Sequence, residues 1–202
     1  MSKQYDAAYF QRWYRDPALK DAAIGGPARL ARKVALAVAT VEYHLERPLR
    51  TVLDVGCGEG AWRAPLLKLR PKLAYLGFDA SEYAIARYGA RRNLHLARFG
   101  DFALLRPCPP VDLLVCSDVL HYLDAGELDR GLPGLAELCG GVAFLETFTR
   151  EDGIDGDTDG FRRRPARFYR ERLAAHGFTP LGSHLWLGPG LADDTAALER
   201  PA

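Results

Sequence analysis

Short apolar runs alternate along the chain with longer stretches in which apolar residues recur every three or four positions. The short runs are rich in Val, Leu and Phe, which is typical of buried strands, and the spacing in the longer stretches is typical of amphipathic helices. Strands are predicted in this way at residues 51–55, 73–78, 94–97, 111–116 and 142–148, with one or two more within 178–187. Helices are predicted between them, at residues 60–69, 81–88, 125–139 and 165–176.

Two further helices are predicted ahead of the first strand. Residues 5–14 are rich in Tyr, Phe and Trp and form a short aromatic helix that ends near Pro17. The break at Gly25–Pro27 then starts a longer helix, because proline suits the first helical position. Apolar residues from Leu30 to Leu45 form one stripe along this helix, which ends near Pro48.

Strands that alternate with helices predict a mostly parallel sheet with helices on both faces, which is an α/β, Rossmann-like architecture. We expect a single domain made of a helical segment over residues 1–47, an α/β core over 48–190 and a tail over 191–202. Ligands bind such sheets at the carboxyl ends of the strands. The turns after the strands are therefore the places to search for chemistry.

The charge balance narrows what this domain is expected to bind. Lys and Arg number 27 and Asp and Glu number 26, so the net charge of +1 argues against a nucleic-acid partner. The four cysteines lack zinc-site spacing, which favours reduced thiols and no metal. The N-terminus has no apolar signal sequence, and no apolar run is long enough to span a membrane. We therefore expect a cytoplasmic protein without a membrane partner.

The strongest chemical signal is the sequence VLDVGCGEG at residues 52–60, where the first predicted strand ends. Glycines at alternate positions let the backbone turn tightly and approach a ligand closely, although a tight turn without a ligand is the alternative. Asp54 lies two residues before the first glycine. A carboxylate at the mouth of a buried strand is costly unless a cation or a hydrogen-bond donor meets it, so Asp54 favours a binding loop.

Acidic residues also follow the next two strands. Asp79, in the sequence FDAS, holds the position at which α/β nucleotide folds bind ribose hydroxyls. The alternative for Asp79 is a helix cap, but Ser81 can provide that cap. Asp101 and Phe102, in the sequence FGDF, suit the amino group and the ring of adenine, and the alternative is a loop acid beside core phenylalanines.

A fourth cluster follows the buried strand in VDLLVCSDVLHYL, residues 111–123. Its polar members are Ser117, Asp118, His121 and Tyr122. We expect them at the same edge of the sheet as the other motifs, because parallel strands end together. The alternatives are helix caps for Ser117 or Asp118 and a structural histidine for His121.

Together and in this order, the four motifs resemble those of the class I S-adenosylmethionine-dependent methyltransferases, over roughly residues 5–187. The resemblance implies a three-layer, Rossmann-like fold, S-adenosyl-L-methionine as cofactor and a helical lid over residues 1–47. The implied cofactor-binding residues are Asp54, Gly56, Cys57, Gly58 and Gly60 for the methionine moiety, Asp79 for the ribose, Ala80, Asp101 and Phe102 for the adenine, and Ser117 and Asp118 near the sulfonium. The lid is implied to place Tyr5, Tyr9 and Trp13 at the acceptor. Glu59 departs from the family pattern, which commonly has a small hydroxyl residue there.

The resemblance also implies in-line methyl transfer, which mainly requires that the enzyme align the two reactants and exclude water. A general base is needed only where the acceptor must lose a proton, and His121 is the candidate, with a structural role as its alternative. The fourth motif lacks the N-P-P-Y or D-P-P-Y pattern associated with amino groups of nucleic acids and proteins. A small-molecule acceptor is therefore expected.

Two oppositely charged runs follow the fifth strand. Residues 151–160 hold five acids and no base, and residues 161–172 hold six Arg and one Glu. Asp155 begins a partial match to a calcium loop, but its twelfth position is Ala166 rather than Glu, so we reject calcium binding. We expect a solvated loop for the acids. Arg162 and Arg164 are candidates to bind a carboxylate or phosphate of the acceptor, unless the two runs pair with each other.

Three other functions fit parts of the pattern. In an NAD(P)-dependent oxidoreductase Gly56, Gly58 and Ala61 would satisfy the glycine motif, but Asp54 would then lie near the dinucleotide phosphates. A non-catalytic, methyltransferase-like binding or regulatory protein is expected to have eroded motifs, which are intact here. An aminopropyltransferase shares the fold, but its acidic polyamine pocket is not evident.

Overall fold

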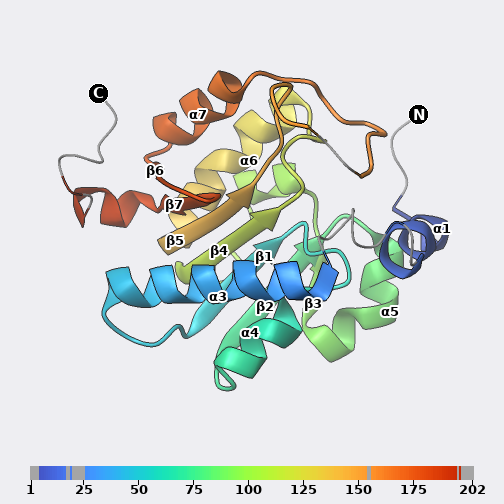
Figure 1. Cartoon of the computed structure of the whole chain (residues 1–202), viewed down its shortest axis with the longest axis horizontal. Coiled ribbons are helices and arrows are strands. Elements are labelled where there is room, and N and C mark those ends of the chain that lie inside the picture. The colour runs from blue at the N-terminus through green and yellow to red at the C-terminus, as the bar shows by residue number, and fades with distance from the viewer. Residues whose placement is uncertain (1–4, 17–18, 20–25, 154–155, 195, 197–202) are drawn as a thin grey trace.

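The computed structural model describes residues 5–16, 19, 26–153, 156–194 and 196. Within these residues seven strands form one sheet in the order β3–β2–β1–β4–β5–β7–β6 (Figure 1). The strands are β1 (Thr51–Val55), β2 (Ala74–Asp79), β3 (Leu94–Leu96), β4 (Val111–Ser117), β5 (Cys139–Glu146), β6 (Thr179–Gly182) and β7 (Leu185–Leu187). Neighbours from β3 to β5 are parallel, and β7 runs antiparallel to β5 and β6. The predicted α/β fold with a mostly parallel sheet is confirmed.

Helices cover both faces of the sheet, with α3 and α4 on one face and α6 and α7 on the other (Figure 1). The helical elements are α1 (Ala7–Phe10), the π-helical turn η1 (Gln11–Arg15), α3 (Gly26–Leu45), α4 (Arg63–Leu69), α5 (Glu82–Arg92), the 3-10 turn η2 (Phe99–Ala103), α6 (Ala125–Leu138), α7 (Ala166–Ala175) and the 3-10 turn η3 (Pro189–Asp194). In the described ranges none of them has the length and apolar character needed to cross a membrane.

Alternate residues of the central strands build one core on each face of the sheet. Val52 of β1 and Leu113 of β4 belong to the core beneath α3, whereas their neighbours Leu53 and Leu114 belong to the core beneath α6. Because both faces are buried, β4 reads as a nearly continuous apolar run rather than an alternating one. The two cores fix the central strands, and their carboxyl ends meet at one edge.

Local signals set most of the helix boundaries. Ser81 caps α5 as predicted, because its Oγ accepts a hydrogen bond from the N–H of Ala84 at 3.1 Å. Asp124 caps α6 in the same way through the N–H of Glu127, at 2.7 Å. Gly177 follows α7 with a φ of +82°, which suits the predicted glycine stop. The predicted breaks at Pro17 and Gly25 lie outside the described residues.

β5 begins at Cys139, three residues before the predicted start at Val142. The added residues include Gly140 and Gly141, which lie between the predicted helix and the predicted strand. A Cβ at Gly141 would lie 2.3 Å from the carbonyl oxygen of Asp112 on β4. Glycine therefore marks a close approach of two strands here rather than a break between a helix and a strand.

Gly134 lets α6 pack directly on η2, and its replacement by Ala should be strongly destabilising. A Cβ at this position would lie 1.9 Å from the carbonyl oxygen of Phe102, a backbone atom that cannot rotate away. Overpacking of this kind costs about 1–3 kcal/mol, and we expect Gly134→Ala to lower the free energy of unfolding in urea by the upper end of that range.

Gly126→Ala provides the matched control, because Gly126 is exposed on the same helix and only flexible side-chain atoms lie near its added Cβ. This substitution should leave the free energy of unfolding unchanged or raise it by up to about 1 kcal/mol. Equal effects of the two substitutions would contradict the packing argument.

Candidate functional site

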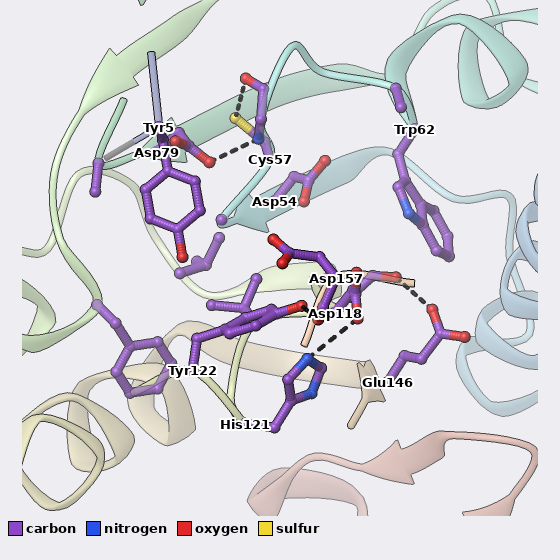
Figure 2. Close-up of a pocket in the computed structure, with 18 of the residues that line it drawn as sticks. Tyr5, Asp54, Cys57, Trp62, Asp79, Asp118, His121, Tyr122, Glu146 and Asp157 are labelled. Carbon is purple, nitrogen blue, oxygen red and sulfur yellow. Dashed lines mark hydrogen bonds and ion pairs between the residues drawn. The ribbon is translucent and has the colours of Figure 1, made fainter. Parts of the chain in front are cut away.

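The carboxyl ends of β1, β2, β4 and β5 open into a cavity of about 570 Å³ (Figure 2). This volume lies within the range of small-molecule sites, about 300–1,000 Å³. Many of the predicted site residues line the cavity together, namely Tyr5, Tyr9, Asp54, Gly56, Cys57, Gly58, Asp79, Ala80, Ser117, Asp118 and His121. The first, second and fourth sequence motifs therefore meet at one place.

The glycine loop after β1 is held open towards the cavity by Asp79 at the end of β2. The two carboxylate oxygens of Asp79 accept hydrogen bonds from the N–H of Gly58 at 2.7 Å and of Ser81 at 2.8 Å. Gly58 has a φ of +54°, and a Cβ there would lie 2.6 Å from the hydroxyl of Tyr14. Burial raises the pKa of the Cys57 thiol well above its usual range, so Cys57 contributes its backbone and bulk rather than a thiolate.

Asp54 at the end of β1 is 2% exposed, and its Oδ2 accepts a hydrogen bond from the hydroxyl of Tyr75 at 2.6 Å. Burial raises the pKa of Asp54 to about 7 against the effect of this hydrogen bond, and the negative charge of Asp79 adds to the rise. Burial also raises the pKa of Asp79, although Gly58 and Ser81 donate to it. Two carboxylates that ionise reluctantly beside one cavity favour a bound cation or donor.

The N-terminal aromatic segment covers the cavity with Tyr5, Tyr9 and Tyr14. Ser81 ties this segment to the sheet edge by donating its hydroxyl hydrogen to the carbonyl oxygen of Tyr5 at 2.5 Å. Trp13, which was predicted at the acceptor, does not line the cavity but a separate hollow with Tyr9 and residues 156–159. Tyr14, for which the sequence predicted no role, lines the cavity beside Gly58 of the glycine loop.

Glu59 connects the N-terminal segment to the glycine loop. Its Oε1 accepts a hydrogen bond from Nη2 of Arg15 at 2.5 Å, and the same Nη2 lies 2.8 Å from the hydroxyl of Tyr88 on α5. The guanidinium of Arg92 lies over the ring of Tyr88 at 4.2 Å. The residue that departs from the family pattern is thus an anchor for the segment that covers the cavity.

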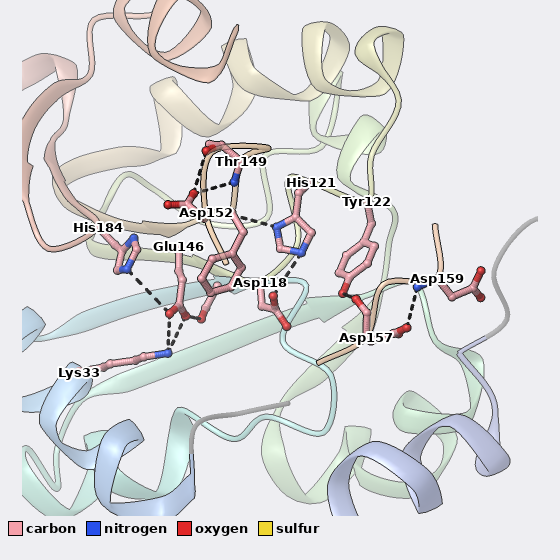
Figure 3. A network of polar contacts seen from close by, with 12 residues as sticks. Lys33, Asp118, His121, Tyr122, Glu146, Thr149, Asp152, Asp157, Asp159 and His184 are labelled. Atoms are coloured by element: carbon pink, nitrogen blue, oxygen red, sulfur yellow. Dashed lines mark hydrogen bonds and ion pairs between the residues drawn. The ribbon is translucent and has the colours of Figure 1, made fainter. Parts of the chain in front are cut away.

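Sequence reasoning missed a buried ion pair at the cavity wall. Nζ of Lys33 on α3 donates to both carboxylate oxygens of Glu146 at 2.6 and 2.7 Å, and the hydroxyl of Ser117 donates to Oε2 of Glu146 at 2.6 Å (Figure 3). Burial alone would raise the pKa of Glu146, but the hydrogen bonds from Lys33 and Ser117 outweigh it and lower the pKa. A lone acid at the end of the apolar strand 142–146 was the available signal.

His121 is fully buried against the cavity, and both of its ring nitrogens are engaged. Nδ1 lies 3.3 Å from the backbone nitrogen of Phe148, which donates to it, and Nε2 lies 3.2 Å from Oδ1 of Asp118 (Figure 3). The amide of Phe148 occupies the Nδ1 lone pair, so the ring proton lies on Nε2 and points at Asp118. This arrangement disfavours the predicted role of His121 as the proton acceptor.

Asp101, Phe102 and Gly60 do not line the cavity as the motif predicted. Oδ2 of Asp101 instead accepts a hydrogen bond from the N–H of Arg98 at 2.8 Å, and so caps the turn η2 to which it belongs. Phe102 is fully buried in the core beneath α6. Ala97 and Phe99 of the same segment line the cavity in their place. The positions of Asp101 and Phe102 favour the alternative of a loop acid beside a core phenylalanine.

The two predicted arginines also lie outside the cavity lining. Arg162 donates its backbone N–H to the carbonyl oxygen of His121 at 2.9 Å, and Arg164 places its guanidinium over the ring of Phe168 at 4.5 Å. The charged runs touch through the backbone, because Glu151 accepts a hydrogen bond from the N–H of Ala166 at 3.0 Å. Both arginines thus support the loop after β5 rather than face a ligand.

Part of the acidic run belongs to the cavity. Asp157 lines it, and the hydroxyl of Tyr122 donates to the carbonyl oxygen of Asp157 at 2.7 Å. Asp155, the first position of the rejected calcium loop, lies outside the described residues. The expectation of a solvated loop is therefore wrong for Asp157, because Tyr122 holds it at the cavity.

The cavity lining is acidic and aromatic. Its carboxylates are Asp54, Asp79, Asp118, Glu127, Glu146 and Asp157, and its basic residues in the described ranges are Arg29 and Lys33. Since Lys33 is bound to Glu146, a net negative charge faces the remaining space. Carboxylates and electron-rich rings both favour a cationic ligand.

Comparisons with known proteins agree with this geometry. Residues 53–141 match the family model of a methyltransferase domain. A segment of 81 residues is 42% identical to trans-aconitate 2-methyltransferase from Methylobacterium nodulans and covers 39% of this chain and 30% of that protein. The structure is similar to a sugar N-methyltransferase from a Streptoalloteichus species over 93% of both chains, with 19% identity and a TM-score of 0.63. It is also similar to the magnesium protoporphyrin IX methyltransferase of Synechocystis with bound S-adenosylmethionine, with 22% identity and a TM-score of 0.60 over 87% of this chain and 83% of that one.

These comparisons differ in the length that they cover and in sequence identity. The match spans 30% of the length of the curated relative, and the solved structures share the fold at low sequence identity. The matched domain contains the glycine loop, Asp79 and Asp118, which are the residues that the cavity brings together. The domain match covers residues 53–141, and the shared architecture shows that the chain has the Rossmann-like fold of these methyltransferases.

Proposed function

We propose that the protein transfers a methyl group from S-adenosyl-L-methionine to a small-molecule acceptor in the cavity. The observation that carries this proposal is the pair Asp54 and Asp79, which flank a glycine loop of positive φ and face an acidic, aromatic space. A sulfonium cofactor is a cation with a ribose and an adenine, and this lining offers a partner to each part.

The residues divide the cofactor between them. Asp79 binds the ribose hydroxyls, the backbone of Gly56 and Gly58 lies against the methionine moiety, and Ala97 with Phe99 borders the adenine. Asp54 balances the positive charge. When bound, the cofactor supplies a methyl group on an activated sulfonium, so the chain itself needs to align the acceptor and exclude water. Tyr5, Tyr9 and Tyr14 form the lid that serves this purpose.

The acceptor site lies beyond the end of β4, where Asp118, Tyr122, Phe148 and Asp157 line the cavity. The balanced net charge of the chain supports a small molecule rather than a nucleic acid as acceptor. Four free cysteines support a reducing compartment, and we propose a cytoplasmic location.

A calorimetric titration tests this function against the NAD(P)-dependent alternative. We expect S-adenosylhomocysteine, the product of the reaction, to bind with micromolar affinity or better, and NAD to show no saturable binding at the same concentrations. Tight binding of NAD with no binding of S-adenosylhomocysteine would overturn the proposal. If the protein binds S-adenosylhomocysteine but transfers no methyl group to any member of a broad panel of acceptors, a regulatory protein would be favoured.

Glu59→Gln should weaken cofactor binding although Glu59 does not line the cavity. The substitution removes the ion pair to Arg15, which anchors the aromatic segment over the glycine loop. We expect the affinity for S-adenosylhomocysteine to fall about three- to tenfold, while the free energy of unfolding changes by less than about 1 kcal/mol, because the pair is partly exposed.

Glu137→Gln is the matched control, since it removes a comparable ion pair, to Arg106, and neither residue lines the cavity. The control should bind S-adenosylhomocysteine like the wild type. An unchanged affinity in Glu59→Gln would show that the anchor has no part in closing the site.

A further inference from the structure

Asp118 is a cavity carboxylate to which the proposed cofactor site assigns no contact. It follows β4 directly, its side chain is 40% exposed, and it lies towards the centre of the cavity in Figure 2. Its backbone is left-handed, with a φ of +64°, although glycine adopts that conformation at lower cost. A strained non-glycine residue at the centre of a cavity is typical of a functional position.

The other buried acids of the lining are already bound by groups of the chain. Tyr75 donates to Asp54, the backbone of Gly58 and Ser81 donates to Asp79, and Lys33 with Ser117 donates to Glu146. These contacts set the direction of each carboxylate and use part of its capacity to accept hydrogen bonds. Asp118 differs from them, because its contact with His121 leaves a large part of the carboxylate facing the cavity.

His121 holds this carboxylate in place. The amide of Phe148 fixes the ring so that the Nε2 proton points at Oδ1 of Asp118, and the rings of Tyr122, Phe148 and Phe161 surround the imidazole within 4.3 to 5.7 Å. A buried, tightly packed imidazole whose Nδ1 lone pair is already engaged can hold the carboxylate next to its Nε2–H in a fixed orientation. His121 therefore acts through Asp118.

The surroundings of Asp118 suit a positively charged group. Burial and then the negative charge of Asp118 raise the pKa of Tyr122, and the charge of Asp118 also acts on Tyr5 and Tyr14. The carboxylates of Asp54, Glu146 and Asp157 line the same cavity, and the ammonium of Lys33 is bound to Glu146. Aromatic faces and a fixed carboxylate together favour an ammonium or an amine N–H.

We propose that Asp118 is a catalytic residue that binds the nitrogen of an amine acceptor opposite the transferred methyl group, and that His121 is its positioning residue. This inference rests on the proposed function and names its acceptor class. The acceptor reacts as the neutral amine: the lone pair of its nitrogen forms the new nitrogen–carbon bond as the carbon–sulfur bond breaks, and sulfur keeps the electron pair of that bond. The surplus proton on nitrogen passes to Asp118 and then to solvent.

Sinefungin tests this assignment without knowledge of the acceptor. In this analogue a carbon that bears a protonated amine replaces the methyl-bearing sulfur, whereas S-adenosylhomocysteine lacks both the methyl group and the charge. The amine of sinefungin therefore probes the point at which the methyl group and a nitrogen nucleophile meet. We expect the wild-type protein to bind sinefungin about tenfold or more tightly than S-adenosylhomocysteine by calorimetry.

Two substitutions delete the charge of Asp118 at a backbone that tolerates them. Asp118→Asn and Asp118→Gly both suit a left-handed φ, so neither is expected to lower the melting temperature. Both should reduce the preference for sinefungin to about twofold or less, while the affinity for S-adenosylhomocysteine stays within about threefold of the wild type. Asp129→Asn, which removes an acid from the outer face of α6, should keep the full preference.

Two variants of His121 separate positioning from folding. His121→Phe removes the donor to Asp118, and His121→Gln restores an N–H near the position of Nε2. We expect the sinefungin preference to fall about threefold or more in His121→Phe and to recover in His121→Gln. Equal preferences in these two variants would overturn the positioning role.

The failure of this inference is distinguishable from the failure of the proposed function. If the wild-type protein binds S-adenosylhomocysteine but prefers sinefungin less than twofold, or if Asp118→Asn keeps the preference, the role of Asp118 is wrong and the cofactor site stands. If S-adenosylhomocysteine itself does not bind to the wild type, the proposed function is wrong and the role of Asp118 is overturned with it.

Discussion

Asp54→Asn should make the ligand-free protein more stable above pH 7 and at the same time weaken its binding of a cationic cofactor. Asp54 is buried, and burial raises its pKa from 3.8 to about 7. A buried carboxylate that is ionised at pH 8 opposes folding, and asparagine removes that charge while its carbonyl oxygen still accepts the hydrogen bond from Tyr75.

The sign of the effect follows from the two pKa values of Asp54. Below pH 3.8 the folded and the unfolded chain both hold the proton, and Asp54 has no effect on stability. Between pH 3.8 and 7 the unfolded chain releases the proton while the folded chain keeps it, so the free energy of unfolding falls as the pH rises. Above pH 7 the loss is complete and approaches about 4 kcal/mol.

Urea unfolding at pH 4 and at pH 8 measures this difference. Asp54→Asn should match the wild type at pH 4 and exceed its stability by several kcal/mol at pH 8. Asp112→Asn is a control of opposite sign, because burial alone would raise the pKa of Asp112, but the hydrogen bonds from Arg47 and from the backbone of Arg50 and Thr51 together outweigh burial and lower it. That control should be less stable than the wild type at pH 8. A lower stability of Asp54→Asn at pH 8 would contradict the prediction.

The same pKa links cofactor binding to protons. A cation beside Asp54 favours the ionised carboxylate, so binding near pH 6 should release a proton, and the affinity for S-adenosylmethionine should rise with pH until about pH 7. Calorimetry in buffers of different ionisation enthalpy measures this proton release. It should be absent in Asp54→Asn, whose affinity should be lower than that of the wild type by most at and above pH 7, where Asp54 is ionised. The Asp54 carboxylate, which destabilises the ligand-free protein, is therefore expected to stabilise the bound cationic cofactor.

The residues that the sequence places at the cavity in agreement with the structure are those whose positions local patterns set. Asp54 and Asp79 each lie at the carboxyl end of a buried strand. The glycines after Asp54 and the helix cap Ser81 after Asp79 show in the sequence that each strand ends there. Parallel neighbours bring the ends of β1 and β2 together without any further information. For this reason two acids far apart in the sequence could be placed at one cavity.

The position of Trp13 in the N-terminal segment differs from the one that the sequence pattern predicts, for a reason of helix geometry. An α-helix places Tyr5, Tyr9 and Trp13 on one face, because they follow each other at intervals of four. The turn over Gln11–Arg15 is π-helical and repeats at intervals of five, so Tyr14 rather than Trp13 follows Tyr9 into the cavity. No propensity in the segment signals this change.

Long-range pairs were also beyond the sequence. Lys33 and Glu146 are 113 residues apart, and their ion pair depends on how α3 crosses the sheet beside β5. The pairing of His121 with Asp118 depends in turn on the amide of Phe148, which belongs to the loop after β5. The sequence identified His121 as a polar group at the cavity, but its role depends on partners that only the tertiary structure supplies.

Asp79→Asn should nearly abolish cofactor binding, with a loss of about 100-fold in the affinity for S-adenosylhomocysteine. Hydrogen bonds to a charged group contribute about 1.5–3 kcal/mol each, and the proposed function gives Asp79 two ribose hydroxyls as partners. In the wild type, the N–H of Gly58 and the N–H of Ser81 each donate to one carboxylate oxygen of Asp79, at 2.7 and 2.8 Å. In Asp79→Asn, one of these N–H groups would face the amide NH₂ of the asparagine, which cannot accept its hydrogen bond. The glycine loop should therefore lose its support as well as its ligand.

Glu82→Gln is the control for this substitution, because Glu82 is an exposed acid three residues further on, in the first turn of α5. It should bind S-adenosylhomocysteine within about twofold of the wild type. The melting temperature of ligand-free Asp79→Asn should lie close to that of the wild type, because burial raises the pKa of Asp79 and the neutral amide avoids that cost while giving up one backbone hydrogen bond. A folded Asp79→Asn that binds S-adenosylhomocysteine within threefold of the wild type would remove the ribose role of Asp79, and with it the observation that most strongly links this cavity to a nucleoside cofactor.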